Sequence, residues 1–359
     1  MAQQTLIPFG PQHPVLPEPI QLRLVLEDEI VVSAIPIIGY IHRGLEKLVE
    51  QKDFQQNPFL LERICGICSF IHSMNYCQGI EKLMGLEVSP RAKYLRVFWS
   101  ELNRLHSHLL WVGLLADSFG YENLFMWAWR AREKVQDLAE FTSGGRVMYG
   151  TCSVGGVRRD LSPDQVRHVL SEMDQLKDQL DKLVPAILND YTVQQRLVGV
   201  GAISREVAFE RGGVGPIARA TGIRYDHRTT GYAAYGDLQF EPIVETAGDC
   251  YARTQVRMRE LYQSIDLIKQ VFSKLPEGPL QVPVKGNPDG ETVTRVEQPR
   301  GEVLYYFKAN GTKNLDRLRV RTPTFANAAA LLAMLPGCEL ADVPVIVLSI
   351  DPCISCTER

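Results

Sequence analysis

Residues 62–68 read Glu-Arg-Ile-Cys-Gly-Ile-Cys, and residues 351–356 read Asp-Pro-Cys-Ile-Ser-Cys. Each stretch holds two cysteines separated by two residues, a spacing that lets both sulfurs turn toward one ion. Most of the 359 residues lie between the two pairs. If the pairs share one site, that site joins the two ends of the chain inside a large fold.

A site built from four thiols requires a bound cation. Ionising a free thiol, whose pKa is near 8.5, costs about 2 kcal/mol at pH 7, and four thiolates cost about 8 kcal/mol. Only a metal offsets this cost, and soft sulfur ligands favour nickel, iron, copper(I) or zinc over magnesium or calcium. The spacing alone leaves a structural zinc site, an iron–sulfur cluster and a nickel site open.

The rest of the composition is that of an ordinary globular protein. Apolar residues make up 45% and charged residues 23%, and 39 basic and 42 acidic residues give a net charge of -3. This balance argues against disorder and against a nucleic-acid surface. The longest apolar run, residues 30–41, is shorter than the roughly 20 residues of a bilayer span, and no signal segment opens the chain. A soluble chain that reaches a membrane through partners is therefore expected.

Four further cysteines are scattered and are expected to be buried small hydrophobes, namely Cys77, Cys152, Cys250 and Cys338.

The patterns of apolar residues, caps and prolines along the chain predict a mainly α fold with small β-rich segments near both termini and a long-helix bundle at the core. Prolines exclude helix near the start, where alternation over 20–26 predicts a strand. Ser-Pro caps open helices expected at 89–116 and 162–187, the second with one apolar stripe. Further helices are expected at 122–141, 242–275 and 324–335, and further strands at 303–307 and 343–350.

No clear linker divides the chain, so one domain over residues 1–359 is expected. It would comprise a β-rich N-terminal segment (1–60), a helical core (61–279) and a β-containing C-terminal segment (280–359) with the second cysteine pair. The glycine cluster at 212–215 lacks a preceding strand signal and is weak support for a nucleotide site.

The two cysteine motifs, with His72 shortly after Cys68, resemble those of the large subunit of nickel–iron hydrogenases. Residues 10–14 and 38–47 are similar both to the membrane-associated, energy-converting (group 4) hydrogenases and to the 49-kDa subunit of respiratory complex I. The short chain resembles the ferredoxin-linked and carbon-monoxide-linked members. The resemblance implies the large-subunit fold and reversible heterolytic cleavage of dihydrogen.

The resemblance also implies the ligand set of a Ni–Fe(CN)2(CO) centre. Cys65 and Cys353 would be terminal nickel ligands, and Cys68 and Cys356 would bridge nickel to iron. His72 would form a hydrogen bond to a bridging sulfur. Such a bond tunes a metal from outside its ligand shell.

Other side chains gain expected roles from the same resemblance. Glu18 would be a proton-relay carboxylate. Arg300 would lie over the open edge of the metals. Asp351 would pair with Arg300 or order solvent there, with Asp117 as a weaker member of this group.

Three expectations concern the periphery of the site. His42 and Arg43 would face the nearest iron–sulfur cluster of a partner subunit. Glu46 matches a glutamate that binds a second metal, magnesium or iron, near the C-terminus of many members. Many members also supply a histidine to that metal, but here the corresponding residue is Arg359.

The sequence has no further cysteine set for relay clusters, so electrons are expected to leave through another polypeptide. Expected partners are a small subunit with a 4Fe–4S cluster, a ferredoxin-like iron–sulfur subunit, membrane ion-pump subunits and ferredoxin, but no nucleic acid. The complex would lie on the cytoplasmic side of the cell membrane.

Two alternatives remain beside the hydrogen-activating enzyme. One is a non-catalytic quinone-coupling subunit as in complex I, whose relatives keep the fold without the cysteines. A zinc-stapled structural protein is more distant. Four cysteines in register favour the enzyme.

Overall fold

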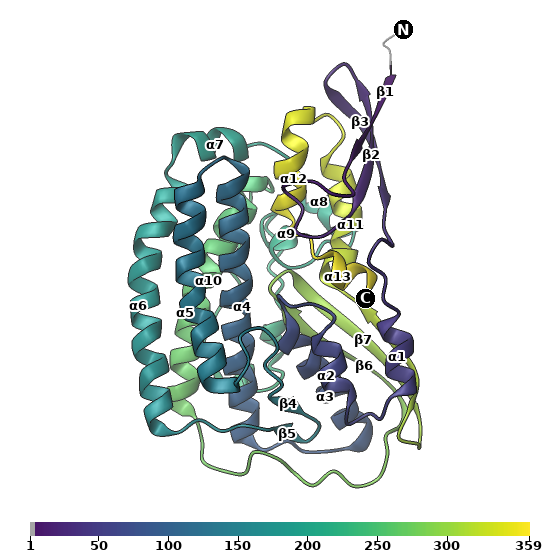
Figure 1. Cartoon of the computed structure of the whole chain (residues 1–359), viewed down its shortest axis with the longest axis vertical. Coiled ribbons are helices and arrows are strands. Elements are labelled where there is room, and N and C mark those ends of the chain that lie inside the picture. The colour runs from purple at the N-terminus through teal and green to yellow at the C-terminus, as the bar shows by residue number, and fades with distance from the viewer. Residues whose placement is uncertain (1–3) are drawn as a thin grey trace.

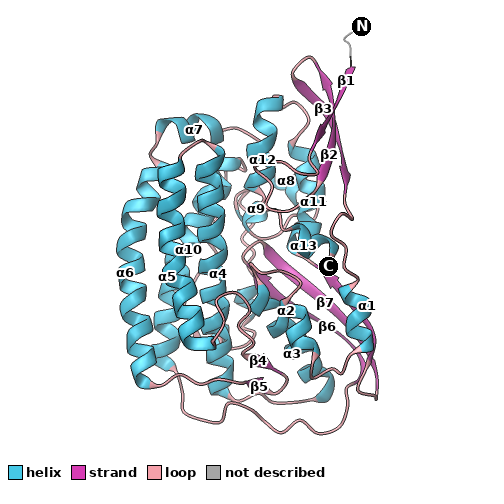
Figure 2. Cartoon of the chain, viewed as in Figure 1, coloured by secondary structure: helices cyan, strands magenta, loops and turns pink. Residues whose placement is uncertain are grey.

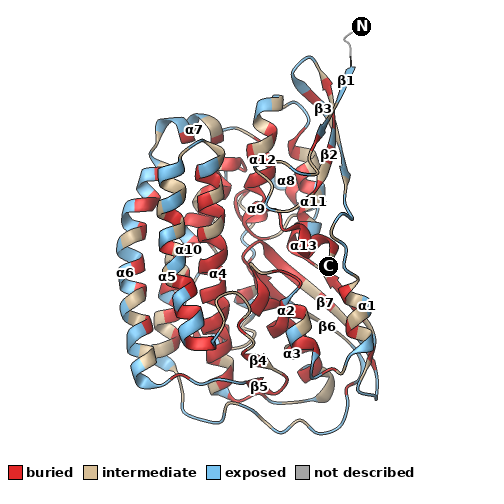
Figure 3. Cartoon of the chain, in the orientation of Figure 1, coloured by how far each residue is buried: buried red, intermediate tan, exposed pale blue. Residues whose placement is uncertain are grey.

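The computed structural model describes residues 4–359, in which four long helices stand side by side on one flank of the molecule (Figure 1). These helices are α4 (Pro90–Ser118), α5 (Glu122–Ser143), α6 (Pro163–Leu188) and α10 (Cys250–Lys274). α4 is buried on nearly all sides, whereas α6 buries a single stripe and exposes the rest (Figure 3). The predicted helical core is therefore confirmed, with α4 at its centre.

The ends of these helices follow from capping side chains. The Ser89 hydroxyl accepts from the amide of Ala92, and Ser162 forms a reciprocal capping box with Gln165. The prediction that a helix begins at 242 was wrong, because α10 begins after Asp249, whose carboxylate accepts from the Ala252 amide.

A three-stranded antiparallel sheet forms the N-terminal segment, in the order β1 (Gln4–Phe9), β2 (Gln21–Glu27) and β3 (Ile30–Ile37). The alternation that predicted β2 is seen in its burial, since Leu22, Leu24 and Leu26 point into the core. Figure 2 shows this sheet separated from the four-helix flank.

The first cysteine pair lies in a loop, residues 63–68, between α2 (Asn57–Glu62) and α3 (Ser69–Met84). α3 packs against α2 and against a second antiparallel sheet. That sheet consists of β6 (Asp289–Gln298), β7 (Gly301–Asn310) and β8 (Leu315–Arg321). The remaining N-terminal helix, α1 (Leu45–Gln51), packs on β8.

The C-terminal segment is more helical than expected. After β8 come α11 (Pro323–Met334), α12 (Val343–Ser349) and α13 (Ile354–Glu358). The predicted strand at 343–350 is wrong, because that stretch is α12. A short apolar run reads the same in a buried helix as in a buried strand, and most of α12 is buried.

The remaining elements are short connectors. They are β4 (Cys152–Ser153), β5 (Gly156–Val157), α7 (Tyr191–Leu197), α8 (Arg205–Glu210), α9 (Pro216–Arg219), and the 3-10 segments η1 (His227–Thr230), η2 (Tyr235–Asp237) and η3 (Leu340–Asp342). Among residues 4–359, no helix combines the length and apolar character needed to cross a membrane.

Candidate metal centre

The structure brings the two cysteine pairs together, although they lie near opposite ends of the sequence. The Sγ atoms of Cys65 and Cys353 are 3.1 Å apart, and those of Cys68 and Cys356 are 3.5 Å apart. All four side chains are buried and none forms a disulfide. The sulfurs of Cys65, Cys68 and Cys356 lie within 4.8 Å of one another, as ligands of one metal must.

The first cysteine loop is held in place by polar contacts at both of its ends. At the end of α2, the Glu62 carboxylate accepts from the Gly150 amide at 3.0 and 3.1 Å. Within the loop, the Ile67 carbonyl accepts from the Asn103 side chain over 3.1 Å. Asn103 belongs to the buried α4, so the loop is tied to the central helix of the fold.

The second cysteine loop, residues 351–356, begins with an unusual backbone conformation. Asp351 has a φ of 55°, which turns the chain sharply between α12 and Cys353. The amide of Cys353 then donates to the Thr324 hydroxyl at the start of α11, over 3.2 Å. These contacts direct Cys353 and Cys356 toward the first loop.

Arg43 ties the two cysteine loops to each other. Its guanidinium donates to the carbonyls of Arg63 and Ile64 in the first loop, over 2.9 and 2.8 Å, and to that of Ser355 in the second, over 3.2 Å. His42 contacts the Glu358 carbonyl through Nδ1 at 2.5 Å. Both residues are exposed, and that they face a partner's cluster stays a prediction. The sequence did not predict that Arg43 joins the two cysteine loops.

The four thiols cannot all ionise in this setting without a cation. Burial raises the pKa of Cys353 to about 11 and that of Cys356 well above its ordinary value. Burial acts in the same direction on Cys68, but hydrogen bonds from Cys356 and Cys65 lower its pKa to about 6. A buried set of four sulfurs fits a soft, thiophilic metal, since the metal supplies the charge that the thiolates need.

His72 contacts the sulfur of Cys356 from α3. Its Nε2 lies 3.3 Å from Cys356 Sγ, and its Nδ1 lies 2.7 Å from the hydroxyl of Tyr305 on β7. Burial lowers the pKa of His72 to about 3, so the ring is neutral. The sequence did not point to Tyr305, which fixes the orientation of the ring.

Arg300 lies in the turn between β6 and β7, and its guanidinium is buried. It donates to the Asp351 carbonyl and carboxylate, each over 2.7 Å, and to the Ser107 hydroxyl over 3.1 Å. Asp117 does not join this group, because it is exposed at the end of α4. Ten residues of helix place it about 15 Å beyond Ser107, the α4 residue that contacts Arg300.

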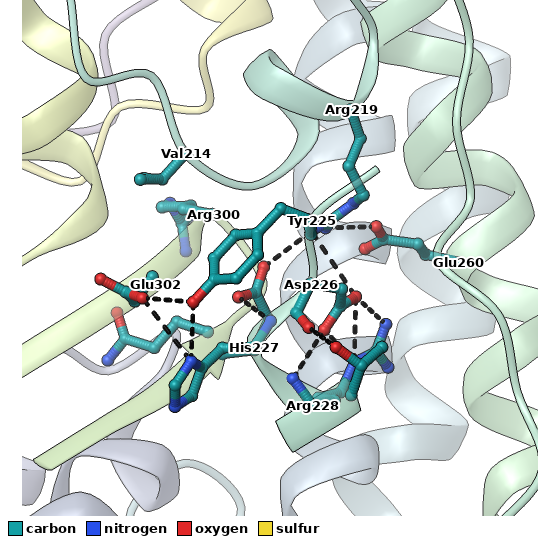
Figure 4. A network of polar contacts seen from close by, with 12 residues as sticks. Val214, Arg219, Tyr225, Asp226, His227, Arg228, Glu260, Arg300 and Glu302 are labelled. Atoms are coloured by element: carbon teal, nitrogen blue, oxygen red, sulfur yellow. Dashed lines mark hydrogen bonds and ion pairs between the residues drawn. The ribbon is translucent and has the colours of Figure 1, made fainter. Parts of the chain in front are cut away.

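A buried network of ion pairs holds the end of β6 that leads to Arg300. Figure 4 shows Arg219, whose two Nη atoms donate to Glu260 Oε1 over 2.6 Å and to Glu297 Oε1 on β6 over 2.8 Å. Beside it, Arg228 pairs with Asp226 over 2.7 Å. Removing one partner of such a buried pair typically costs about 3–5 kcal/mol. The network thus gives the Arg300 turn a rigid base.

The glycine cluster at 212–215 supports the same turn. A Cβ on Gly215 would lie 2.4 Å from the Arg300 carbonyl oxygen and 2.4 Å from the Gly301 Cα. The next residue back, Val214, donates its amide to Asn327, whose side chain in turn donates to the Arg300 carbonyl. Only glycine permits this close approach of the two backbones.

We expect Gly215→Ala to destabilise the protein by about 2 kcal/mol more than Gly212→Ala, because only the first forces the Arg300 turn to move. Both glycines have positive φ angles, 64° and 68°, and Gly215 adds a ψ of -141°, a combination that only glycine adopts readily. A Cβ on Gly212 meets no atom within 4 Å. Thermal unfolding of both variants checks this. Equal shifts in Tm would show that backbone strain, and not the contact with Arg300, explains the loss.

Glu18 lies in the loop between β1 and β2, where its Oε2 accepts from the Ser355 amide over 2.7 Å. Burial and the charge of Cys353 raise the pKa of this carboxyl, although the contacts with Ser355 act against the rise. The structure therefore places Glu18 against the second cysteine loop.

Glu46 does not fit a second metal. Its Oε1 accepts from Arg359 Nε over 2.8 Å and from the Val320 amide over 2.9 Å, and its Oε2 accepts from Arg319 over 3.0 Å. Within residues 4–359, the three cysteines above are the one group of three His, Cys, Asp or Glu side chains close enough to share an ion.

Comparison with known proteins supports both sides of the resemblance. The family model for the respiratory-chain NADH dehydrogenase 49 Kd subunit matches residues 118–286 and 282–359, and that for nickel-dependent hydrogenase matches residues 43–117. The chain is 41% identical to the carbon monoxide-induced hydrogenase of Rhodospirillum rubrum, covering 98% of this chain and 99% of that protein. It is 39% identical to the membrane-bound hydrogenase subunit alpha of Pyrococcus furiosus, covering 98% and 87% respectively.

A solved structure is similar over the whole chain. A chain of the membrane-bound sulfane sulfur reductase, an archaeal respiratory membrane complex, superimposes with a TM-score of 0.95 at 33% identity, covering 99% of this chain and 98% of that one.

Proposed function

Because the chain belongs to the family of nickel–iron hydrogenase large subunits and complex I 49-kDa subunits, on its energy-converting (group 4) side, we propose that it activates dihydrogen within a membrane-bound complex. The observation that carries the proposal is the buried cluster of four sulfurs, with Cys65 and Cys353 3.1 Å apart. A subunit that only transmits conformational change needs no such cluster.

In this proposal Cys65, Cys68, Cys353 and Cys356 would hold the nickel and iron of the centre. When bound, this group supplies the redox chemistry that splits dihydrogen or forms it from protons and electrons. His72 orients Cys356, since it contacts that sulfur and is itself fixed by Tyr305.

In the same proposal Arg300 supplies a fixed positive charge and Glu18 transfers protons. Arg300 presents a permanent positive charge whose direction is fixed by Asp351 and Ser107. Glu18 exchanges protons at the second cysteine loop, where its carboxylate contacts the Ser355 amide.

The proposal includes partners that carry the electrons away. The described residues offer one cysteine cluster, so electrons pass to a separate iron–sulfur subunit with a 4Fe–4S cluster, and from there to a ferredoxin-like subunit and ferredoxin. Exposed Arg43 contacts both cysteine loops and exposed His42 contacts the Glu358 carbonyl, so both suit the face toward that subunit. Membrane subunits hold the complex at the cytoplasmic face and couple the reaction to ion translocation.

Metal analysis with infrared spectroscopy tests the proposal directly. We expect the purified complex to contain nickel and to show absorption bands of carbon monoxide and cyanide bound to iron. Zinc in the cysteine cluster, without such bands, would refute the proposal and indicate a structural site.

A quinone-coupling role without dihydrogen chemistry is the second candidate. The long match to the 49 Kd family model, over residues 118–286 and 282–359, favours it. A complex that lacks nickel but reduces a soluble quinone analogue would support this role, and the same spectra therefore separate the two candidates.

A further inference from the structure

The last residue of the sequence is joined to two other elements through one carboxylate. Glu46 on α1 accepts from Arg359 Nε over 2.8 Å and from Arg319 Nη1 on β8 over 3.0 Å. The Val320 amide, also on β8, donates to the same oxygen as Arg359 over 2.9 Å. The Glu46 and Arg359 side chains are only 13% and 18% exposed, so the pair is well shielded from water.

The residue before it is anchored just as firmly. The Glu358 carboxylate accepts from the amides of Gly39 and Ile41, each over 2.6 Å. The two amides flank Tyr40, and both are directed at one carboxylate, so this stretch of main chain binds the Glu358 anion. Glu358 and Arg359 therefore fix the end of α13 to the segment that leads into α1.

These anchors connect directly to the second cysteine loop. The Arg359 amide donates to the Ser355 carbonyl over 3.0 Å. The Thr357 amide and hydroxyl both donate to the Cys353 carbonyl, over 3.2 and 2.9 Å. A displacement of Arg359 would therefore be transmitted to Cys353 through a single turn of helix.

The chemistry of Glu46 explains why a metal does not fit here. Two guanidinium groups bring two positive charges to its carboxylate, which is the charge that a divalent cation would bring. A guanidinium offers only donors and does not lose its proton, so it occupies the oxygens that a metal would need.

We propose that Arg359 takes the place of a second metal, and that the Arg319–Glu46–Arg359 cluster positions the second cysteine loop without any divalent cation. We call this cluster the C-terminal latch. The latch stands on its own contacts, and only its consequence for the metal centre rests on the proposed function.

The test compares Arg359→Gln with a matched control, Arg317→Gln, in the full chain within its complex. Arg317 pairs with Glu50 over 2.9 Å, which is another contact between β8 and α1 but one that does not touch α13. Hydrogen exchange of the amides in residues 354–359 and the Tm are measured with Mg²⁺ or Mn²⁺ and with EDTA. Nickel is quantified in every sample.

We expect the unaltered protein to give the same exchange rates with EDTA as with Mg²⁺ or Mn²⁺. Arg359→Gln should speed exchange in residues 354–359 by about tenfold, because the end of α13 opens locally. It should lower the Tm by about 3 °C. Arg317→Gln should leave the exchange of α13 unchanged.

Two results would overturn the proposal. If EDTA speeds exchange of α13 in the unaltered protein and Mg²⁺ or Mn²⁺ reverses it, a divalent cation holds this end of the chain. If Arg359→Gln exchanges no faster than Arg317→Gln, the latch does not position the loop. Neither readout uses hydrogen turnover. The latch proposal can therefore fail while nickel and the infrared bands support the proposed function, and the proposed function can fail while the exchange data support the latch.

Discussion

Replacing any one of Cys65, Cys68, Cys353 and Cys356 by serine is expected to reduce hydrogen turnover about a thousandfold or more, an increase in the barrier of about 4 kcal/mol. Each sulfur lies in the buried cluster within contact of a sulfur from the other pair. A hydroxyl is a hard ligand that stays protonated at neutral pH, so it binds nickel poorly. Dye-linked hydrogen oxidation and nickel content, measured on the same preparations, check the prediction.

Cys77→Ser is the matched control for these variants. Cys77 is a fully buried thiol on α3, the helix that follows the first cysteine loop, but it belongs to no metal-binding group among the described residues. Burial raises its pKa well above the ordinary value, so it remains a neutral thiol. This variant should keep normal turnover with a stability loss of about 1–2 kcal/mol. A cluster variant that behaves like Cys77→Ser would lose its assignment as a ligand.

Glu18→Gln is expected to cut proton-linked turnover about 100-fold, the scale of a lost acid–base group, without changing nickel content. The amide keeps the shape of the side chain and an oxygen that still accepts from the Ser355 amide, a contact of 2.7 Å in this structure. It cannot take up a proton. The measurement compares hydrogen–deuterium exchange, which needs proton transfer at the site, with electron transfer to a dye.

Arg300→Lys should affect the other half of the reaction, the activation of dihydrogen, and leave proton exit unchanged. A lysine retains the charge but cannot reproduce the contacts of the guanidinium with Asp351 and Ser107, so activation of dihydrogen should slow while proton exit is untouched. If Glu18→Gln exchanges hydrogen for deuterium at the normal rate, protons leave by another route, such as a cysteine and bound water.

Local patterns in the sequence predicted most of the fold. The apolar stripe of 163–188 and the cap at Ser162 act within one helix, so α6 needed no knowledge of its neighbours. The alternation that predicted β2 is equally local. The stretch 343–350 failed because its apolar residues carry no period, and only burial in the fold makes it a helix.

In the candidate site, too, the residues in local motifs could be predicted and those placed by tertiary contacts could not. The motifs pointed to the cysteines and to His72, which lies one helical turn from Cys68. Tyr305 and Ser107 reach the site only through tertiary contacts, and nothing near them in the sequence indicates it. Arg43 was expected near the site, but its contacts with both cysteine loops were not. Asp117 is the converse case, since it lies exposed in the last turn of α4, about 15 Å from the α4 residue that contacts Arg300.

The contact between Cys65 and Cys353 spans 288 positions of the chain, and this separation sets the time that passes between the synthesis of the two cysteines. At about 5–20 residues per second, a ribosome that has made Cys65 needs about 15–60 s to reach Cys353. Throughout that interval the first pair is a free two-sulfur chelator in a cell that contains zinc. Correct loading therefore depends on keeping this half-site from stray metal until its other half has been made.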